Sequence, residues 1–173
     1  YRFHDFCKIM QDPVTKVYYN GIHTLIENGK RRNGEVNKDM YGYNSGSMIL
    51  VDLELYRITG EEKYLEDAKA TSKAAYDAFL RKDEKSGKLY FRDFRWFTAI
   101  LAEGWSALIE LGCENEKEYM KVLGESIDDA VCFMSPEGLL PHDLVCGYRD
   151  NNNDDRLLLT HSAIAEIAVL CTK

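Results

Sequence analysis

The first candidates for chemistry in this chain are two adjacent carboxylates, Asp128 and Asp129. Hydrolysis of a glycosidic bond needs two carboxyl groups about 5 to 9.5 Å apart, on opposite sides of the bond that breaks. Both residues lie in the middle of a predicted helix, where neighbouring side chains point about 100° apart. A solvated helix face therefore explains this pair better than catalysis, and we assign no catalytic residue within the chain.

A second acidic group imitates a calcium-binding loop. Asp150, Asn152 and Asp154 have the spacing of the first three EF-hand ligands, but Asp155 stands at the glycine position and His161 at the terminal glutamate position. A polar loop leading into the last helix is the better interpretation. The four histidines lack metal-ligand spacing, and we expect neither a metal ion nor another cofactor.

Two clusters combine aromatic side chains with hydrogen-bonding groups. Tyr41, Tyr43 and Asn44 form the first cluster, and Phe94 and Arg95 form the second. Sugars bind with their C–H surfaces against aromatic faces and with their hydroxyls bonded to a few convergent polar groups. Both clusters begin predicted helices, which is where a helical barrel has its mouth. The alternative is that the aromatic residues belong to the core and that Arg95 is an ordinary surface charge.

The elements that must position these clusters are helices. Hydrophobic periodicity predicts helices over residues 48–58, 64–79, 94–108, 116–134 and 157–170, and the tail of another over 1–10. The helix over 48–58 is apolar nearly all round, as expected of a buried helix. Gly60 is well placed to stop it, and Thr59 and Glu62 have the spacing of a capping box for the next helix.

Two of these helices carry a single apolar stripe that we expect to face the core. The stripe of the helix over 64–79 consists of Tyr64, Leu65, Ala68, Ser72, Ala75 and Phe79. That of the helix over 116–134 consists of Tyr119, Val122, Leu123, Ile127, Ala130 and Val131.

The segments between the helices alternate in length. Residues 11–39 and 136–155 are long, polar loops, whereas the turns at 59–62 and 112–116 are tight. Helical hairpins joined in this way predict an all-α toroid or solenoid of paired helices. In such a ring the long loops gather on one face and can build a site there.

Composition limits the class of the protein. The 173 residues suit a single domain over 1–173, with enough apolar residues for a core. The net charge of −7 disfavours binding to the phosphate backbone of a nucleic acid and to an anionic membrane surface. We expect neither as a partner. No apolar stretch is long enough for membrane insertion. Because the chain begins at Tyr1, we expect a processed or partial product whose targeting information is hidden.

Five cysteines are scattered along the chain without any Cys-x-x-Cys pair: Cys7, Cys113, Cys132, Cys146 and Cys171. This spacing fits neither a disulfide framework nor a zinc site. Free thiols favour a reducing, cytoplasmic compartment. An extracellular location and a single disulfide stay open.

Three blocks, taken in order, resemble the family 76 glycoside hydrolases, which are endo-acting α-1,6-mannanases with an (α/α)6 barrel. The first is Asp12-Pro-Val-Thr-Lys-Val-Tyr-Tyr-Asn-Gly-Ile22, similar to a family loop ending in Asp-Gly. The second, Tyr43-Asn44-Ser45-Gly46, is similar to Tyr-Asn-Gln-Gly at the start of an inner helix. The third, Phe94-Arg95-Trp96-Phe97, is similar to the aromatic and basic start of the next inner helix.

This resemblance implies a mannan-like oligo- or polysaccharide as substrate. It also implies that the substrate-binding residues are Asn20, Gly21, Tyr41, Tyr43, Asn44, Phe94 and Arg95. Asn20 departs from the family, which usually has Asp at this position. The catalytic Asp-Asp pair of the family lies in the preceding half of the barrel and has no counterpart here.

The predicted helices amount to about half of an (α/α)6 barrel, so we expect a C-terminal fragment of a larger catalytic domain. Half a barrel would expose a large apolar edge. We therefore expect a companion N-terminal half or self-association, and no activity from the isolated chain. Two other functions stay open: a non-catalytic carbohydrate-binding or scaffold protein, and another α/α-barrel sugar enzyme such as an unsaturated uronyl hydrolase or an epimerase.

Overall fold

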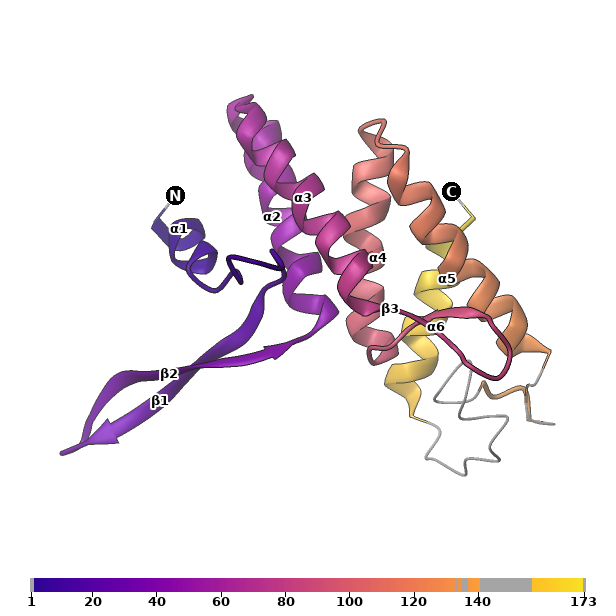
Figure 1. Ribbon diagram of the computed structural model, residues 1–173, viewed down its shortest axis with the longest axis horizontal. Coiled ribbons are helices and arrows are strands. Elements are labelled where there is room, and N and C mark those ends of the chain that lie inside the picture. Colours follow the sequence, from indigo (N-terminus) through magenta and orange to yellow (C-terminus); the bar gives the residue numbers. More distant parts are fainter. Residues whose placement is uncertain (1, 133, 135–136, 141–156, 173) are drawn as a thin grey trace.

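The predicted helices form the framework of the molecule. The computed structural model describes residues 2–132, 134, 137–140 and 157–172. In chain order the elements are α1 (Arg2–Lys8), β1 (Tyr19–Glu27), β2 (Lys30–Met40), α2 (Gly42–Thr59), α3 (Glu62–Phe79), β3 (Leu80–Lys82), β4 (Leu89–Phe91), α4 (Arg95–Glu110), α5 (Asn115–Val131) and α6 (Leu158–Leu170). The prediction of a fold built from paired helices is confirmed (Figure 1).

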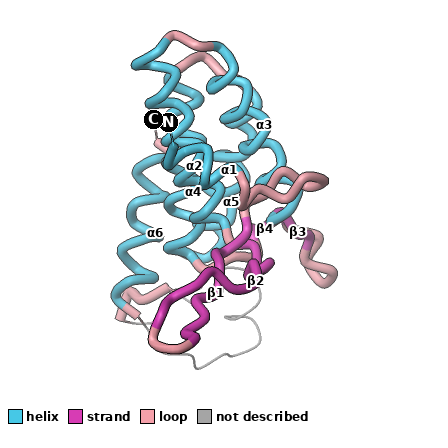
Figure 2. Tube along the Cα trace, turned by 90° about the vertical axis from the view of Figure 1, so that its left-hand side faces the viewer, coloured by secondary structure: helices cyan, strands magenta, loops and turns pink. Residues whose placement is uncertain are grey.

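The helices form two rows. One row is α2, α4 and α6, in which each helix contacts the next, and α3 and α5 cover it as a second row. The tight turns after α2 and α4 lie at one end of the helices, whereas the two β-hairpins lie toward the other end (Figures 1 and 2). Within the described residues, none of the helices combines the length and the apolar character needed to cross a bilayer.

The contact between α2 and α4 is made by glycines. A Cβ atom at position 46 would lie 2.6 Å from the carbonyl oxygen of Ile100, and one at position 104 would lie 3.1 Å from Cγ2 of Ile49. Only glycine leaves room for such an approach of two backbones. The largest buried side chain, Trp105, follows directly and packs with Leu53 and Leu101 in the core.

The apolar stripes of α3 and α5 lie inward, with one exception. In α3 the buried residues include Tyr64, Ala68, Ser72, Ala75 and Phe79. In α5 they include Tyr119, Val122, Leu123, Ile127 and Ala130. The inward prediction for Val131 is wrong, because its side chain is 45% exposed. Val131 lies about 120° around the helix from Tyr119, off the stripe that Ala130 completes.

The junction between α2 and α3 is partly as predicted. Gly60 ends α2 in the left-handed conformation (φ 70°) and donates its N–H to Tyr56. The predicted capping box is wrong: α3 begins after Glu61, and Thr59 still belongs to α2. The hydroxyl of Thr59 donates to the carbonyl of Leu55 and accepts the N–H of Glu61 at 3.1 Å. It therefore closes the turn instead of capping α3.

Residues 11–39, predicted as a long polar loop, instead contain an antiparallel hairpin. Strands β1 and β2 pair from Tyr19–Met40 to Glu27–Lys30, so Asn28 and Gly29 form a two-residue turn. Both turn residues have positive φ (51° and 73°), as a type I′ hairpin turn requires. The hairpin extends away from the helices (Figure 1). Since most of β2 is exposed, it lacks the apolar alternation by which a strand is predicted.

A second, shorter hairpin lies between α3 and α4. The polar turn at 83–88 joins its strands, β3 and β4. Of the second predicted loop, 136–155, only residues 137–140 are described, and the acidic residues from Asp150 to Asp155 lie outside the described residues.

We predict that Gly46→Ala destabilises the fold by about 2 kcal/mol, because the new methyl group must push α4 away from α2. Chemical denaturation of both proteins measures the difference. Gly124→Ala on α5 is the matched control: its Cβ would meet Cys171 at an ordinary 3.6 Å, so it should stabilise the helix by about 0.5–1 kcal/mol. Equal effects of the two substitutions would contradict the close-packing argument.

A second prediction concerns acid. The carboxylate of Asp12 accepts the N–H groups of Thr15 and Val14 and the hydroxyl of Tyr19. These hydrogen bonds lower the pKa of Asp12 from 3.8 to about 2, and the bond from the N–H of Thr15 has the largest effect. The folded state thus gains stability from this group above pH 3.8 and loses it as the pH falls toward about 2.

Asp12→Asn should flatten this part of the acid dependence, since an amide still accepts the backbone N–H groups but does not titrate. Urea unfolding of both proteins between neutral pH and about pH 2 measures the effect. Parallel pH profiles for the two proteins would show that Asp12 does not contribute in this way.

Candidate functional site

The candidate site lies where two inner helices begin. Strand β2 ends at Met40, with one residue between it and the start of α2, and β4 ends at Phe91, with three residues between it and the start of α4. Asp93 connects the two starts: its carboxylate accepts the N–H of Gly42, the first residue of α2, and the N–H of Phe94 at 2.9 Å. The predicted clusters around Tyr41 and Phe94 are therefore brought together.

Aromatic rings from both helices form one continuous group. Tyr43 stacks on Tyr41 with ring centroids 6.1 Å apart and on Trp96 of α4 at 6.0 Å. Phe97 lies beneath them, 4.6 Å from Tyr43 and 3.8 Å from Trp96. Phe97 is buried, whereas Phe94 is 51% and Trp96 36% exposed. The buried ring thus supports partly exposed ones, which offer flat apolar surfaces to a ligand.

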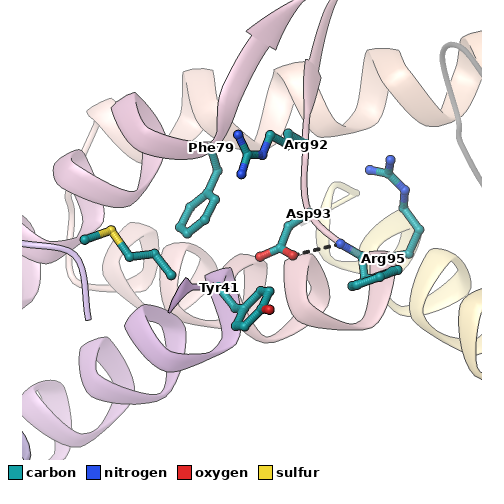
Figure 3. Close-up of a pocket in the computed structure, with 7 residues that line it drawn as sticks. Tyr41, Phe79, Arg92, Asp93 and Arg95 are labelled. Atoms are coloured by element: carbon teal, nitrogen blue, oxygen red, sulfur yellow. Dashed lines mark hydrogen bonds between the residues drawn. The ribbon is translucent and has the colours of Figure 1, made fainter. Parts of the chain in front are cut away.

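A cavity of about 250 Å³ opens on one side of this group (Figure 3). It is lined by Met40, Tyr41, Phe79, Arg92, Asp93, Phe94 and Arg95. Arg95 is only 6% exposed and donates from Nη1 to the carbonyl of Phe91 at 3.1 Å. The alternative in which Arg95 is an ordinary surface charge is therefore wrong.

A second cavity, of about 260 Å³, lies on the other side, between α1, β1 and α2. Its lining includes the predicted residues Asn20, Gly21, Tyr43 and Asn44. The hydroxyl of Tyr43 donates to Oδ1 of Asn20 at 2.5 Å, which ties the base of the hairpin to α2. Within the described part of the chain, the buried Nδ2 of Asn44 has no hydrogen-bond partner.

The seven predicted residues therefore fall into two cavities on either side of the stacked Tyr41 and Tyr43. The prediction missed the acidic member of the first cavity. Burial raises the pKa of Asp93, and the N–H groups of Gly42 and Phe94 oppose this shift. A carboxylate immediately before the aromatic start of a predicted helix was the available indication, because acidic groups are favoured at helix N-termini.

The other candidates for chemistry have ordinary structural surroundings. Asp129 forms an ion pair with Lys88, and Asp128 is exposed on α5. His161 donates from Nδ1 to the carbonyl of Leu157 and accepts the N–H of Leu140 at Nε2. Among the described residues, no group of three or more His, Cys, Asp or Glu side chains is placed to hold a metal ion.

Known structures share this fold. A family 76 glycoside hydrolase from a bovine Bacteroides thetaiotaomicron strain superposes with a TM-score of 0.75 at 19% identity, covering 98% of this chain and 37% of that one. A family 76 mannosidase from Bacteroides thetaiotaomicron VPI-5482 gives 0.72 at 22% identity, covering 98% and 46%. The chain thus spans less than half the length of these structures and has the α/α toroid architecture.

No curated protein matches the sequence. The model of the family described as Glycosyl hydrolase family 76 matches residues 5–170, nearly the whole chain. Its place in the sequence agrees with the three blocks that carried the resemblance. The chain belongs to glycosyl hydrolase family 76.

Proposed function

We propose that this chain is the C-terminal part of a glycoside hydrolase acting on α-1,6-linked mannan, and that it supplies the substrate-binding side of the cleft. The observation that carries the proposal is the pair of cavities flanking one aromatic group at the starts of α2 and α4. Exposed rings such as Trp96 would take the C–H face of a mannose unit. Asn20 and Asn44 would bond its hydroxyls.

The acid chemistry would come from outside this chain. Glycoside hydrolysis needs a carboxylic acid that protonates the leaving oxygen and a carboxylate that acts as nucleophile or base. Among the described residues that line the two cavities, Asp93 is the only acidic one, and both of its oxygens already accept backbone N–H groups. The chain's contribution would be binding and orientation of the sugar.

Exposed apolar side chains on α1 and α6 support the proposal that another part of the protein covers these helices. Phe3 on α1 and Leu158 on α6 are each 81% exposed, and Phe6 and Val169 are also exposed. α1 lies on the α2 side of the row formed by α2, α4 and α6, and α6 is the other end of that row (Figure 1). We propose that the preceding half of the toroid covers these faces in the whole protein; self-association of two such chains is the alternative.

The purified chain should bind α-1,6-linked mannooligosaccharides without hydrolysing them. Isothermal titration calorimetry measures binding, and a reducing-end assay measures turnover. An α-1,4-linked glucan oligosaccharide of the same length is the control and should bind more weakly. Release of reducing ends by this chain alone would contradict the placement of the acids elsewhere, and equal binding of both sugars would contradict the proposed specificity.

The non-catalytic alternative is favoured by one observation, the amide at Asn20 where the family usually has a carboxylate. The coding sequence upstream of Tyr1 decides between the two. A tryptophan-flanked Asp-Asp pair there supports the enzyme, and its absence supports a binding or scaffold protein.

Tyr43→Phe should weaken mannan binding about fivefold, since loss of one hydrogen bond costs about 1 kcal/mol and releases Asn20 from its position. Tyr56→Phe is the matched control, because the Tyr56 hydroxyl donates to Glu62 at the far end of α2. Affinities of both variants are measured by calorimetry. A larger loss from the Tyr56 variant would contradict the role of the Tyr43–Asn20 bond.

A further inference from the structure

Asp93 serves two helices at once. The first N–H groups of a helix have no partner within it and are usually capped by Ser, Thr, Asp or Asn at the preceding position. Tyr41 and Phe94 occupy that position before α2 and α4, and neither side chain makes a capping bond. Asp93 satisfies one such N–H group at each helix start, because its two oxygens accept the N–H of Gly42, the first residue of α2, and that of Phe94, which directly precedes α4.

This bridge joins segments 51 residues apart in the sequence. Its approach to α2 is close, since a Cβ atom at position 42 would lie 3.2 Å from Oδ2 of Asp93. The aromatic rings of the site follow closely after the two residues, Gly42 and Phe94, whose N–H groups Asp93 accepts. Tyr43 lies one residue beyond Gly42, Trp96 lies two beyond Phe94, and their rings stack across the two helices.

We infer that Asp93 is a positioning residue for glycan binding, which sets the aromatic surface of α2 against that of α4 and leaves the sugar to other side chains. The inference rests on the proposed function for its ligand. Direct contact with a sugar is the competing role, and it is disfavoured because the half-buried carboxylate already uses both oxygens. Burial raises the pKa of Asp93, whereas the N–H groups of Gly42 and Phe94 and the charges of Arg95 and Arg92 oppose this shift.

The test uses the full chain labelled with 5-fluorotryptophan. The chain has two tryptophans: Trp96 in the aromatic group, and Trp105, which is fully buried in the core. Fluorine NMR therefore gives one resonance at the site and one internal control. The variants are Asp93→Ala, Asp93→Asn and, as matched control, Asp83→Asn, which alters another buried carboxylate that accepts a backbone N–H, that of Ser86.

For Asp93→Ala we expect the Trp96 resonance to shift or broaden while that of Trp105 stays in place, and mannan affinity to fall about tenfold. Asp93→Asn keeps one acceptor oxygen, so both effects should be intermediate. Asp83→Asn should leave the Trp96 resonance and the affinity unchanged. Should the alanine variant fail to fold, the asparagine variant carries the test.

Two results would overturn the inference. One is an unchanged Trp96 resonance together with lost affinity, which would indicate direct sugar contact. The other is equal disturbance of Trp96 and Trp105, which would indicate a general structural role. The fluorine measurement needs no ligand, so it decides the positioning role even where the wild-type chain fails to bind mannan, a result that would count against the proposed function alone.

Discussion

The approach of two backbones at Gly46 and Gly104 is the constraint on which the rest of the structure depends. Without side chains between them, α2 and α4 run in direct contact, and Ile49, Leu101 and Trp105 fill the space around the crossing. This contact fixes how the starts of the two helices lie relative to each other. The aromatic residues of the site lie at those helix starts, so the packing of α2 against α4 also sets the positions of these rings.

The site itself is built on helix starts, and polar bridges between segments hold it. Asp93 ties α4 to α2, and the Tyr43–Asn20 bond ties α2 to the first hairpin. Each bridge joins residues distant in sequence. Tyr41 lines one cavity and Tyr43 the other, and the two rings stack on each other.

The sequence predicted those features that depend on local pattern. The stripes of α3 and α5 follow helical periodicity, and Gly60 stops α2 because only a left-handed residue fits there. The β1–β2 hairpin was missed because both of its faces are mostly exposed, although the turn pair Asn28-Gly29 favours a hairpin. Asp93 could not be assigned a role from the sequence, because that role depends on a partner N–H 51 residues away. Five of the site residues were singled out by their types at the starts of predicted helices, and the family resemblance added Asn20 and Gly21. The structure divides all seven between two cavities.

The projecting β1–β2 hairpin is a two-stranded sheet, so within the described residues each of its strands has one edge that pairs with no other strand. Such edges can recruit the edges of other molecules and begin aggregation. The hairpin carries charged side chains along its length, among them Glu27, Lys30, Arg31 and Arg32, and bulges interrupt its pairing near Gly21 and Ile22. The same polar composition that concealed the strands in the sequence thus disfavours the addition of a neighbouring molecule's strand to this sheet.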